Sequence, residues 1–154
     1  FIDKYLGDAI MAVFDRPDHH AQDALTAAIA MQQTLRDFNL DRTRFNLADP
    51  IRIGVGIHTG QAIIGTLGSE RRMDSTVIGD VVNTAARLEE LTKFYGRPVL
   101  LSESVIEHLQ QPELFNVRWI DCVAPRGKQQ QSNLYQLLGM QSSTCSGAYC
   151  EVCA

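Results

Sequence analysis

The sequence lacks several features that would assign a protein to a class at once. No apolar run approaches the about 20 residues of a membrane-spanning helix, and no charged and then apolar signal peptide opens the chain. Positive charge is not in excess, because 14 Lys and Arg stand against 18 Asp and Glu, a net charge of -4. A basic surface for nucleic acid is therefore not expected, and phosphate must be bound by individually placed residues.

The chain has 154 residues, 45% of them hydrophobic and 21% charged, which is typical of one soluble domain. It does not begin with Met, and Phe1 to Lys4 already reads as a strand. We therefore interpret it as a fragment of a longer protein, with a cytoplasmic location expected for this part, whether or not the parent is attached to a membrane or carries a sensor.

The most informative stretch is D-S-T-V-I-G-D-V-V-N-T-A-A-R-L-E, from Asp74 to Glu89. Residues 76–78 are typical of a strand, Gly79 ends it, and Asp80 is a suitable N-cap for a following helix. At helical spacing one side of that helix is apolar, which predicts the face that packs on a core; its members are Val81, Ala85, Leu88 and Thr92.

Asn83 and Arg87, four residues apart, share the other side of this helix. An amide and a guanidinium beside a glycine turn suit a sugar oxygen and a phosphate, and the planar fork of arginine fits phosphate well. For this pair taken alone, an ordinary solvated helix face is the favoured interpretation.

The first 14 residues predict a β-hairpin that turns at Gly7-Asp8, with Asp8 exposed at its tip. A long helix is predicted over 21–38, capped by Asp18. Residues 51–67 alternate as a strand pair turning near Gly60-Gln61, and their many glycines predict close backbone approach to a neighbour.

Residues 69–73 are expected to form a mobile loop, and His58 a packed polar residue beside a turn. Further along, strands are predicted over 99–102, 117–123 and 134–138, with Cys122 in the core and a short helix reaching His108. Residues 125–128 are predicted to form a basic glycine loop between two of these strands. Residues 139–154 carry Ser, Gly and three cysteines without hydrophobic periodicity, which predicts disorder; Cys145, Cys150 and Cys153 leave open a metal site or a redox pair.

The 74–89 stretch closely resembles the signature of the class III nucleotidyl cyclases, the adenylyl and guanylyl cyclase catalytic domains. The resemblance includes K-Y-L-G-D at 4–8, G-V-G-I-H-T-G at 54–60 and R-G-K at 126–128, in the order of the family. It covers residues 1–138, which are expected to form a partial catalytic domain. It implies an α/β, ferredoxin-like sandwich that lacks its first strand and the helices after it.

The resemblance also implies roles for individual residues. Lys4 and Thr76 match the two positions that read the purine, and lysine with threonine there favours ATP, because a lysine donates to the adenine N1 acceptor. Asn83 would orient the ribose, Arg87 would stabilise charge on the α-phosphate, and Lys128 would hold the terminal phosphates. The residues after Lys128 depart from the family pattern.

Asp8 matches one of two family aspartates that hold a pair of Mg²⁺ or Mn²⁺ ions. The other lies in a pattern like F-x-D-I-x-G-F-T, which is absent from this sequence. The implied reaction converts ATP to 3',5'-cyclic AMP and pyrophosphate at the interface of a homodimer, with a monomer inactive. A catalytically silent nucleotide-binding or dimerisation module and a guanylyl cyclase remain as alternatives.

Overall fold

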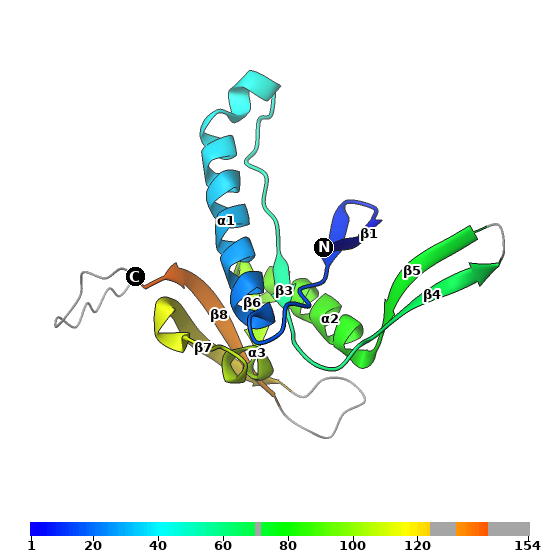
Figure 1. Ribbon diagram of the computed structural model, residues 1–154. Helices are drawn as coiled ribbons and strands as arrows, with labels where there is room; N and C mark the ends of the chain where they lie inside the picture. The colour runs from blue at the N-terminus through cyan, green and yellow to red at the C-terminus, as the bar shows by residue number, and fades with distance from the viewer. Residues whose placement is uncertain (70–71, 124–131, 142–154) are drawn as a thin grey trace.

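A computed structural model describes residues 1–69, 72–123 and 132–141 (Figure 1). The elements in chain order are β1 (Ile2–Leu6), β2 (Ala9–Ala12), α1 (His20–Leu40), a 3-10 turn (Arg42–Phe45), β3 (Val55–Ile57), β4 (Ile63–Ser69), β5 (Arg72–Ile78), α2 (Asp80–Tyr95), β6 (Val99–Ser102), α3 (Glu103–Glu107), a second 3-10 turn (Pro112–Leu114), β7 (Phe115–Val123) and β8 (Ser132–Met140). The mixed α/β architecture agrees with the prediction.

The core is a four-stranded sheet in the order β3-β6-β8-β7, in which β3 and β6 are parallel and the other pairs are antiparallel. All four residues of β6 are buried, as expected of an apolar strand covered on both faces. Leu101 packs in a cluster with Leu25 of α1, whereas Leu100 packs with Leu88 of α2. The two helices therefore cover opposite faces of the sheet.

Helix α2 approaches β3 so closely that its backbone occupies the space of a side chain. A Cβ added to Gly56 would lie 2.3 Å from the Ala85 carbonyl oxygen and 2.3 Å from the Glu89 nitrogen. A Cβ added to Gly54 would lie 2.1 Å from the Thr92 hydroxyl. The predicted close backbone approach is confirmed at these two glycines.

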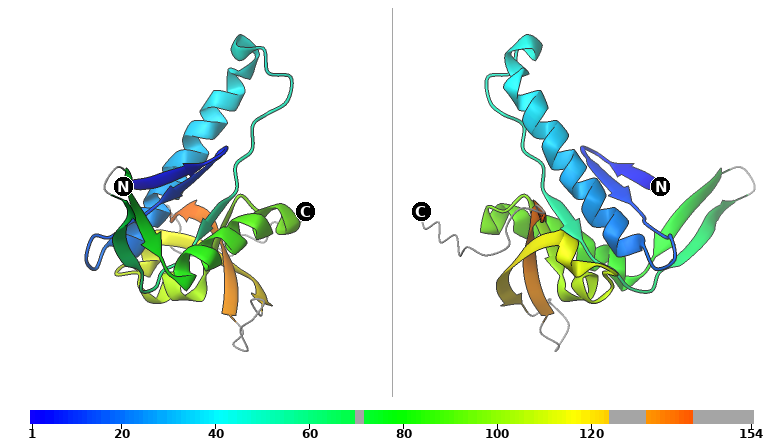
Figure 2. Two further views of the ribbon diagram at one scale, coloured as in Figure 1. Left: turned by 90° about the vertical axis from the view of Figure 1, so that its right-hand side faces the viewer. Right: turned by 60° about the vertical axis from the view of Figure 1, so that its left-hand side comes forward.

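Two hairpins stand outside the four-stranded sheet (Figures 1 and 2). Strands β1 and β2 are joined at Gly7, whose φ of +66° is readily adopted by glycine, and this confirms the predicted turn. Strands β4 and β5 pair antiparallel from Ile63 with Ile78 to Ser69 with Arg72, and their ribbon projects away from the rest of the molecule.

Several local predictions were wrong. Residues 51–67 do not form one strand pair, because β3 pairs with β6 while β4 pairs with β5. The expected loop over 69–73 is largely strand, since β4 runs to Ser69 and β5 starts at Arg72. Sequence periodicity cannot tell a strand paired with its neighbour from one paired with a distant segment.

The two predicted helix caps were also displaced. Helix α2 has Gly79 as its N-cap, with Asp80 as its first helical residue, and α1 has His19 rather than Asp18 as its N-cap. Gly79 has no side chain that could cap the helix, and the side chain of His19 makes no capping hydrogen bond. Cys122 lies in β7 as predicted but is exposed and not in the core, because side chains alternate along the strand and Cys122 lies on the opposite face from the less exposed Asp121 and Val123.

None of the helices within the described ranges combines the length and apolar character needed to cross a bilayer.

Candidate functional site

Helix α2 presents different chemistry on its two sides. Leu88 and Thr92 are buried against the sheet, whereas Asn83 and Arg87 are exposed. The first turn is regular: the Val82 amide donates to the Gly79 carbonyl at 3.2 Å, and the Thr84 hydroxyl donates to the Asp80 carbonyl at 2.9 Å. The predicted division of this helix is confirmed, and the amide and guanidinium lie one turn apart on its solvent side.

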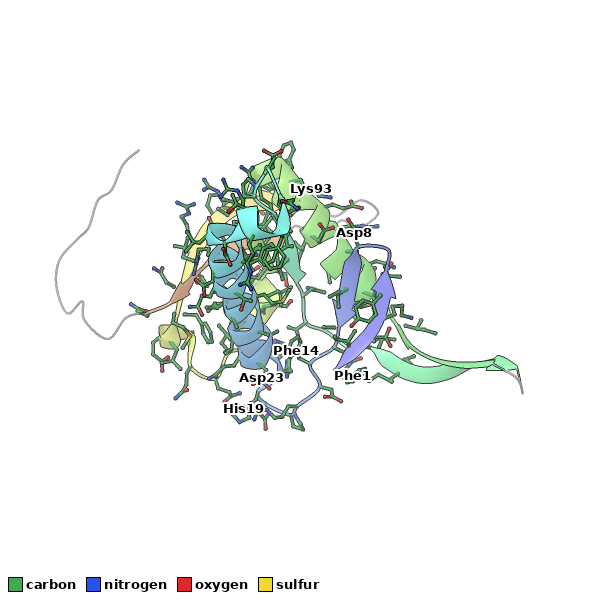
Figure 3. The ribbon with its side chains drawn as sticks, turned by 90° about the horizontal axis from the view of Figure 1, so that it is seen from above. Phe1, Asp8, Phe14, His19, Asp23 and Lys93 are labelled. Atoms are coloured by element: carbon green, nitrogen blue, oxygen red, sulfur yellow. The ribbon has the colours of Figure 1, made fainter. Side chains whose placement is uncertain are left out.

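The β1–β2 hairpin carries the other two described polar candidates. Asp8 is exposed at the turn, at the opposite end of the strand pair from Phe1 (Figure 3). Lys4 is partly exposed in β1, and its ammonium lies 3.1 Å from Oδ2 of Asp3. The hairpin therefore offers a carboxylate at its tip and a cation along its first strand.

The structure brings β1, which carries Lys4, into contact with β5, which carries Thr76. The backbone of Thr76 pairs with Gly65, and two residues further on β5 leads into the Gly79 turn and α2. The two predicted base-reading positions thus lie on neighbouring elements, although their sequence separation is large. Lys128, predicted to hold phosphates, lies outside the described residues, as do Cys145, Cys150 and Cys153.

Asp8 is the residue of this chain that the family resemblance assigns as a metal ligand. Among residues 1–69, 72–123 and 132–141, no three His, Cys, Asp or Glu side chains gather as a metal site. An exposed carboxylate at a turn is nevertheless a suitable oxygen donor for Mg²⁺, which often takes one or two carboxylates and completes its shell with phosphate oxygens and water. Asp8 fits one such ligand, with phosphate supplying others.

His58 belongs to a hydrogen-bonded network that ties the end of β3 to the start of α3. Its Nδ1 lies 2.7 Å from the Ser102 hydroxyl and 3.2 Å from that of Ser104, and the two hydroxyls are 2.8 Å apart. Ser104 also donates to the Thr59 carbonyl at 3.2 Å. With Ser102 buried, this is the packed polar arrangement predicted for His58.

Two polar contacts escaped the sequence analysis. The Tyr95 hydroxyl donates to the Asp121 carboxylate at 2.6 Å and joins the end of α2 to β7. This hydrogen bond raises the pKa of Tyr95 to about 12 and lowers the pKa of Asp121, which also accepts from the Cys122 amide. The second is the Asp3 to Lys4 pair, and no periodicity signals either of them.

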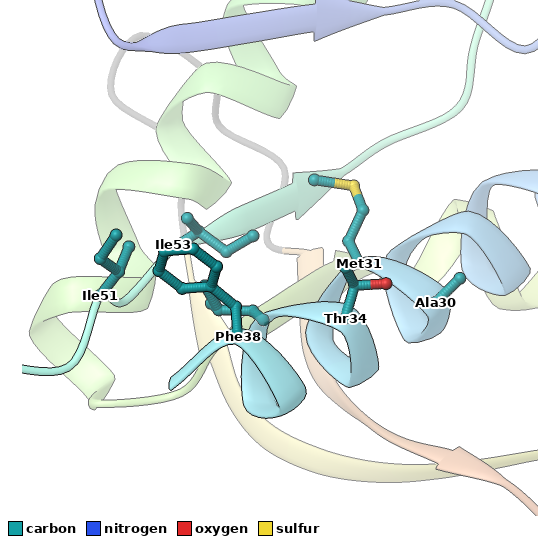
Figure 4. Close-up of a pocket in the computed structure, with 7 residues that line it drawn as sticks. Ala30, Met31, Thr34, Phe38, Ile51 and Ile53 are labelled. Atoms are coloured by element: carbon teal, nitrogen blue, oxygen red, sulfur yellow. The ribbon is translucent and has the colours of Figure 1, made fainter. Parts of the chain in front are cut away.

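An apolar hollow lies between the C-terminal half of α1 and the segment before β3 (Figure 4). Its lining includes Met31, Phe38, Ile51 and Ile53 and contains no charged side chain. A triphosphate needs cations and hydrogen-bond donors, so this hollow does not suit a nucleotide. None of the predicted site residues lines it.

Comparison with known proteins gives a consistent result. The family described as "Adenylate and Guanylate cyclase catalytic domain" matches residues 4–139 of the chain. The adenylate cyclase of Anabaena cylindrica is 49% identical over 141 residues, which are 89% of this chain and 28% of that protein. A terminal-differentiation specific adenylate cyclase of Dictyostelium discoideum is 39% identical, over 90% of this chain and 6% of that protein. The chain thus spans a small part of these relatives.

Two solved structures share the fold. The guanylyl cyclase Cya2 has a TM-score of 0.78 at 28% identity, and the alignment covers 94% of this chain and 72% of that chain. The adenylyl cyclase CyaB from P. aeruginosa also has a TM-score of 0.78, at 27% identity, covering 91% of this chain and 72% of that chain. One of these structures is named a guanylyl cyclase and the other an adenylyl cyclase. The shared fold therefore does not indicate which purine nucleotide a chain uses.

Proposed function

This chain belongs to the family of adenylate and guanylate cyclase catalytic domains, and from that premise we propose that it converts ATP to 3',5'-cyclic AMP and pyrophosphate. The observation that carries the proposal is the contact of the Lys4 strand with the β5–α2 unit, which bears Thr76, Asn83 and Arg87. A base-reading cation, a ribose-binding amide and a phosphate-binding guanidinium then belong to adjacent elements. In this proposal the catalytic domain extends to the end of β8 at Met140, two residues beyond the predicted boundary at 138, so the disorder predicted from residue 139 was wrong for Gly139 and Met140.

The choice of ATP follows from the chemistry of Lys4. An ammonium donates hydrogen bonds and accepts none, so it suits N1 of adenine, which is an acceptor. Guanine carries an N–H at that position. Two hydrogen-bond donors would then face each other, and no hydrogen bond could form with the ammonium. Thr76 adds a hydroxyl that can both donate and accept, and it completes the base-reading pair in this proposal.

In the reaction the ribose 3'-hydroxyl gives its proton to solvent water, and its oxygen forms a bond to the α-phosphorus. The bond from the α-phosphorus to the bridging oxygen of the β-phosphate breaks, and pyrophosphate leaves with that electron pair. Asn83 holds the ribose so that the attack is in line, and the Arg87 guanidinium stabilises the charge that develops on the α-phosphate oxygens. Lys128 holds the β- and γ-phosphates.

Asp8 would hold Mg²⁺ or Mn²⁺, and a pair of such ions supplies charge neutralisation of the phosphates and activation of the attacking hydroxyl. The second carboxylate of the family pair is not among the motifs of this sequence. This favours the catalytically silent nucleotide-binding module as the second candidate function for the chain as it stands.

We further propose that the chain acts as a homodimer joined through the faces of its two hairpins. Both hairpins expose apolar side chains that are 49% to 71% accessible, and such exposed clusters mark interaction surfaces. The members are Tyr5, Leu6, Ile10, Ile63, Ile64 and Ile78. A second copy suits this surface, because Lys4 and Asp8 would then serve opposite sites, as the family resemblance implies.

The test is the formation of cyclic AMP and pyrophosphate by the full chain with Mn²⁺ and ATP, together with its mass in solution. Arg87→Ala should lower turnover about a hundredfold or more, which is typical of removing a positioned charge-stabilising donor. Lys93→Ala is the matched control, because Lys93 is a well exposed cation on the same helix. Its ion pair with Glu89 is long, with 4.0 Å between Nζ and Oε1, and is therefore weak.

Turnover by the wild-type chain that disappears in Arg87→Ala and persists in Lys93→Ala supports the cyclase proposal. Tight ATP binding by a folded dimer that releases no cyclic AMP would overturn it in favour of the silent module.

A further inference from the structure

An irregularity in the β1–β2 hairpin coincides with a buried carboxylate. Ile2 pairs with Ala12 while Lys4 pairs with Met11, so Asp3 is the extra residue of a β-bulge. Pairing continues beyond it, since Phe1 and Val13 exchange two backbone hydrogen bonds of 2.8 Å. The bulge is therefore an internal feature of the hairpin and does not come from a frayed end.

The bulge has a direct consequence for the two side chains beside it. In a regular strand, adjacent residues point to opposite faces of the sheet and their heads do not meet. Here the Lys4 ammonium lies 3.1 Å from Oδ2 of Asp3, the next residue in the chain. Bulges are enriched beside functional sites, where they re-aim a side chain.

The carboxylate of Asp3 is buried but, within the described ranges, lacks the hydrogen bonds that usually accompany a buried charge. Its side chain is 1% exposed, and neither oxygen has an aligned hydrogen-bond partner among the residues that the structure describes. A buried charge without hydrogen bonds is costly unless an opposite charge lies close by. Lys4 supplies that charge. The attraction of its ammonium to the Asp3 carboxylate therefore favours one position of the ammonium.

Lys4 itself is suited to reach a ligand from that place. Its side chain is 35% exposed, in contrast to that of Asp3. An ammonium has three donors, so contact with Asp3 is compatible with a hydrogen bond from the same nitrogen to an acceptor on a bound base.

We propose that Asp3 is a positioning residue for base selection, which acts through Lys4 by fixing its ammonium against the buried carboxylate on the β1 bulge. The inference rests on the proposed role of Lys4 in reading adenine. Without the carboxylate, the flexible four-carbon stem of Lys4 would let the ammonium sample many positions, and the preference for adenine over guanine would fall.

The test is calorimetric binding of ATP and of GTP to the full chain in Mn²⁺, supplemented by KM and kcat. Asp3→Asn removes the charge and keeps the shape. It should weaken ATP binding about tenfold, as expected for loss of a charge-assisted contact, and change GTP binding less than twofold. kcat at saturating ATP should stay unchanged. Asp37→Asn, which removes an exposed carboxylate from α1, is the control and should leave both affinities unchanged.

A double-mutant cycle separates positioning from a merely structural role. In a Lys4→Met background, Asp3→Asn should cause no further loss of ATP affinity. Equal weakening of ATP and GTP, or the same loss with and without Lys4, would overturn the inference. If Asp3→Asn does not fold, Asp3→Glu decides, because the longer carboxylate displaces the ammonium and should reduce discrimination, whereas unchanged discrimination contradicts the proposal.

The two proposals fail in different ways. Binding of ATP without formation of cyclic AMP overturns the cyclase activity and leaves the binding test of Asp3 intact. Normal cyclase activity with Asp3→Asn indistinguishable from wild type overturns only the role of Asp3.

Discussion

The four-stranded sheet with its helices and the two projecting hairpins obey different physical rules. In the sheet, apolar residues such as Leu25, Leu101 and Leu134 are almost completely buried. In the hairpins, residues of the same chemical kind, such as Tyr5 and Ile63, are 68% and 71% exposed. The sheet is therefore stabilised by its own packing, while the hairpins present surface that suits a ligand or a second chain. Helix α2 joins the two regions, because one side packs on the sheet and the other carries Asn83 and Arg87.

The largest effect is expected where α2 meets the sheet. Gly56→Ala should prevent stable folding, at a cost of about 4 kcal/mol or more, since the new Cβ would lie 2.3 Å from backbone atoms of α2 that cannot move independently. Gly65→Ala in the β4–β5 hairpin is the control, because no atom of the part of the chain that the structure describes lies within 4 Å of its added Cβ. Chemical denaturation measures the free energy of unfolding of both variants. Equal values would contradict the expected difference between the sheet and the hairpin.

Truncating one large side chain in each region should give the next largest difference. Leu101→Ala should lower the free energy of unfolding by about 3 kcal/mol, because Leu101 is completely buried and its loss leaves a cavity. Ile63→Ala, on the exposed hairpin, should change monomer stability by less than about 0.5 kcal/mol. Urea unfolding at low protein concentration compares the monomers. A cost for Ile63→Ala as large as that for Leu101→Ala would show that the hairpin is packed like the core.

The smallest effect concerns the hydrogen bond between Tyr95 and Asp121. Because its folded-state pKa is lowered, Asp121 contributes stability that is present above its unfolded pKa and lost as the pH falls through the folded value. Tyr95, raised to about 12, contributes stability that is present below its unfolded pKa near 10 and lost as the pH rises through about 12.

Tyr95→Phe should therefore flatten the stability profile in acid and in strong base, with a modest loss at neutral pH because the pair is partly exposed to solvent. Thermal melts from pH 2 to pH 7 measure the acid limb. An acid limb identical to that of the wild type would exclude this hydrogen bond as its source.

The features that sequence predicted well depend on neighbouring residues. The Gly7-Asp8 turn and the two sides of α2 both follow from local spacing and glycine geometry. Strands β7 and β8 were predicted in place, each somewhat shorter than observed. Asn83 and Arg87 could be assigned to the exposed side of α2 for the same reason.

The features that sequence missed depend on distant or irregular contacts. The pairing of β3 with β6 joins segments about 40 residues apart, and nothing in the alternation of 51–67 indicates it. The bulge at Asp3 breaks the period of two on which strand predictions rest, so its contact with Lys4 could not be foreseen. The Tyr95 to Asp121 bond likewise joins residues 26 positions apart.

The central claim is that the chain selects ATP through Lys4 and Thr76, and competition between ATP and GTP tests it most directly. The wild-type chain, with Mn²⁺ and both nucleotides present, should bind and cyclise ATP in preference to GTP. Lys4→Glu combined with Thr76→Cys should move the preference towards GTP, since a carboxylate accepts from the N–H that guanine presents. An unchanged preference in a folded double variant would contradict the account.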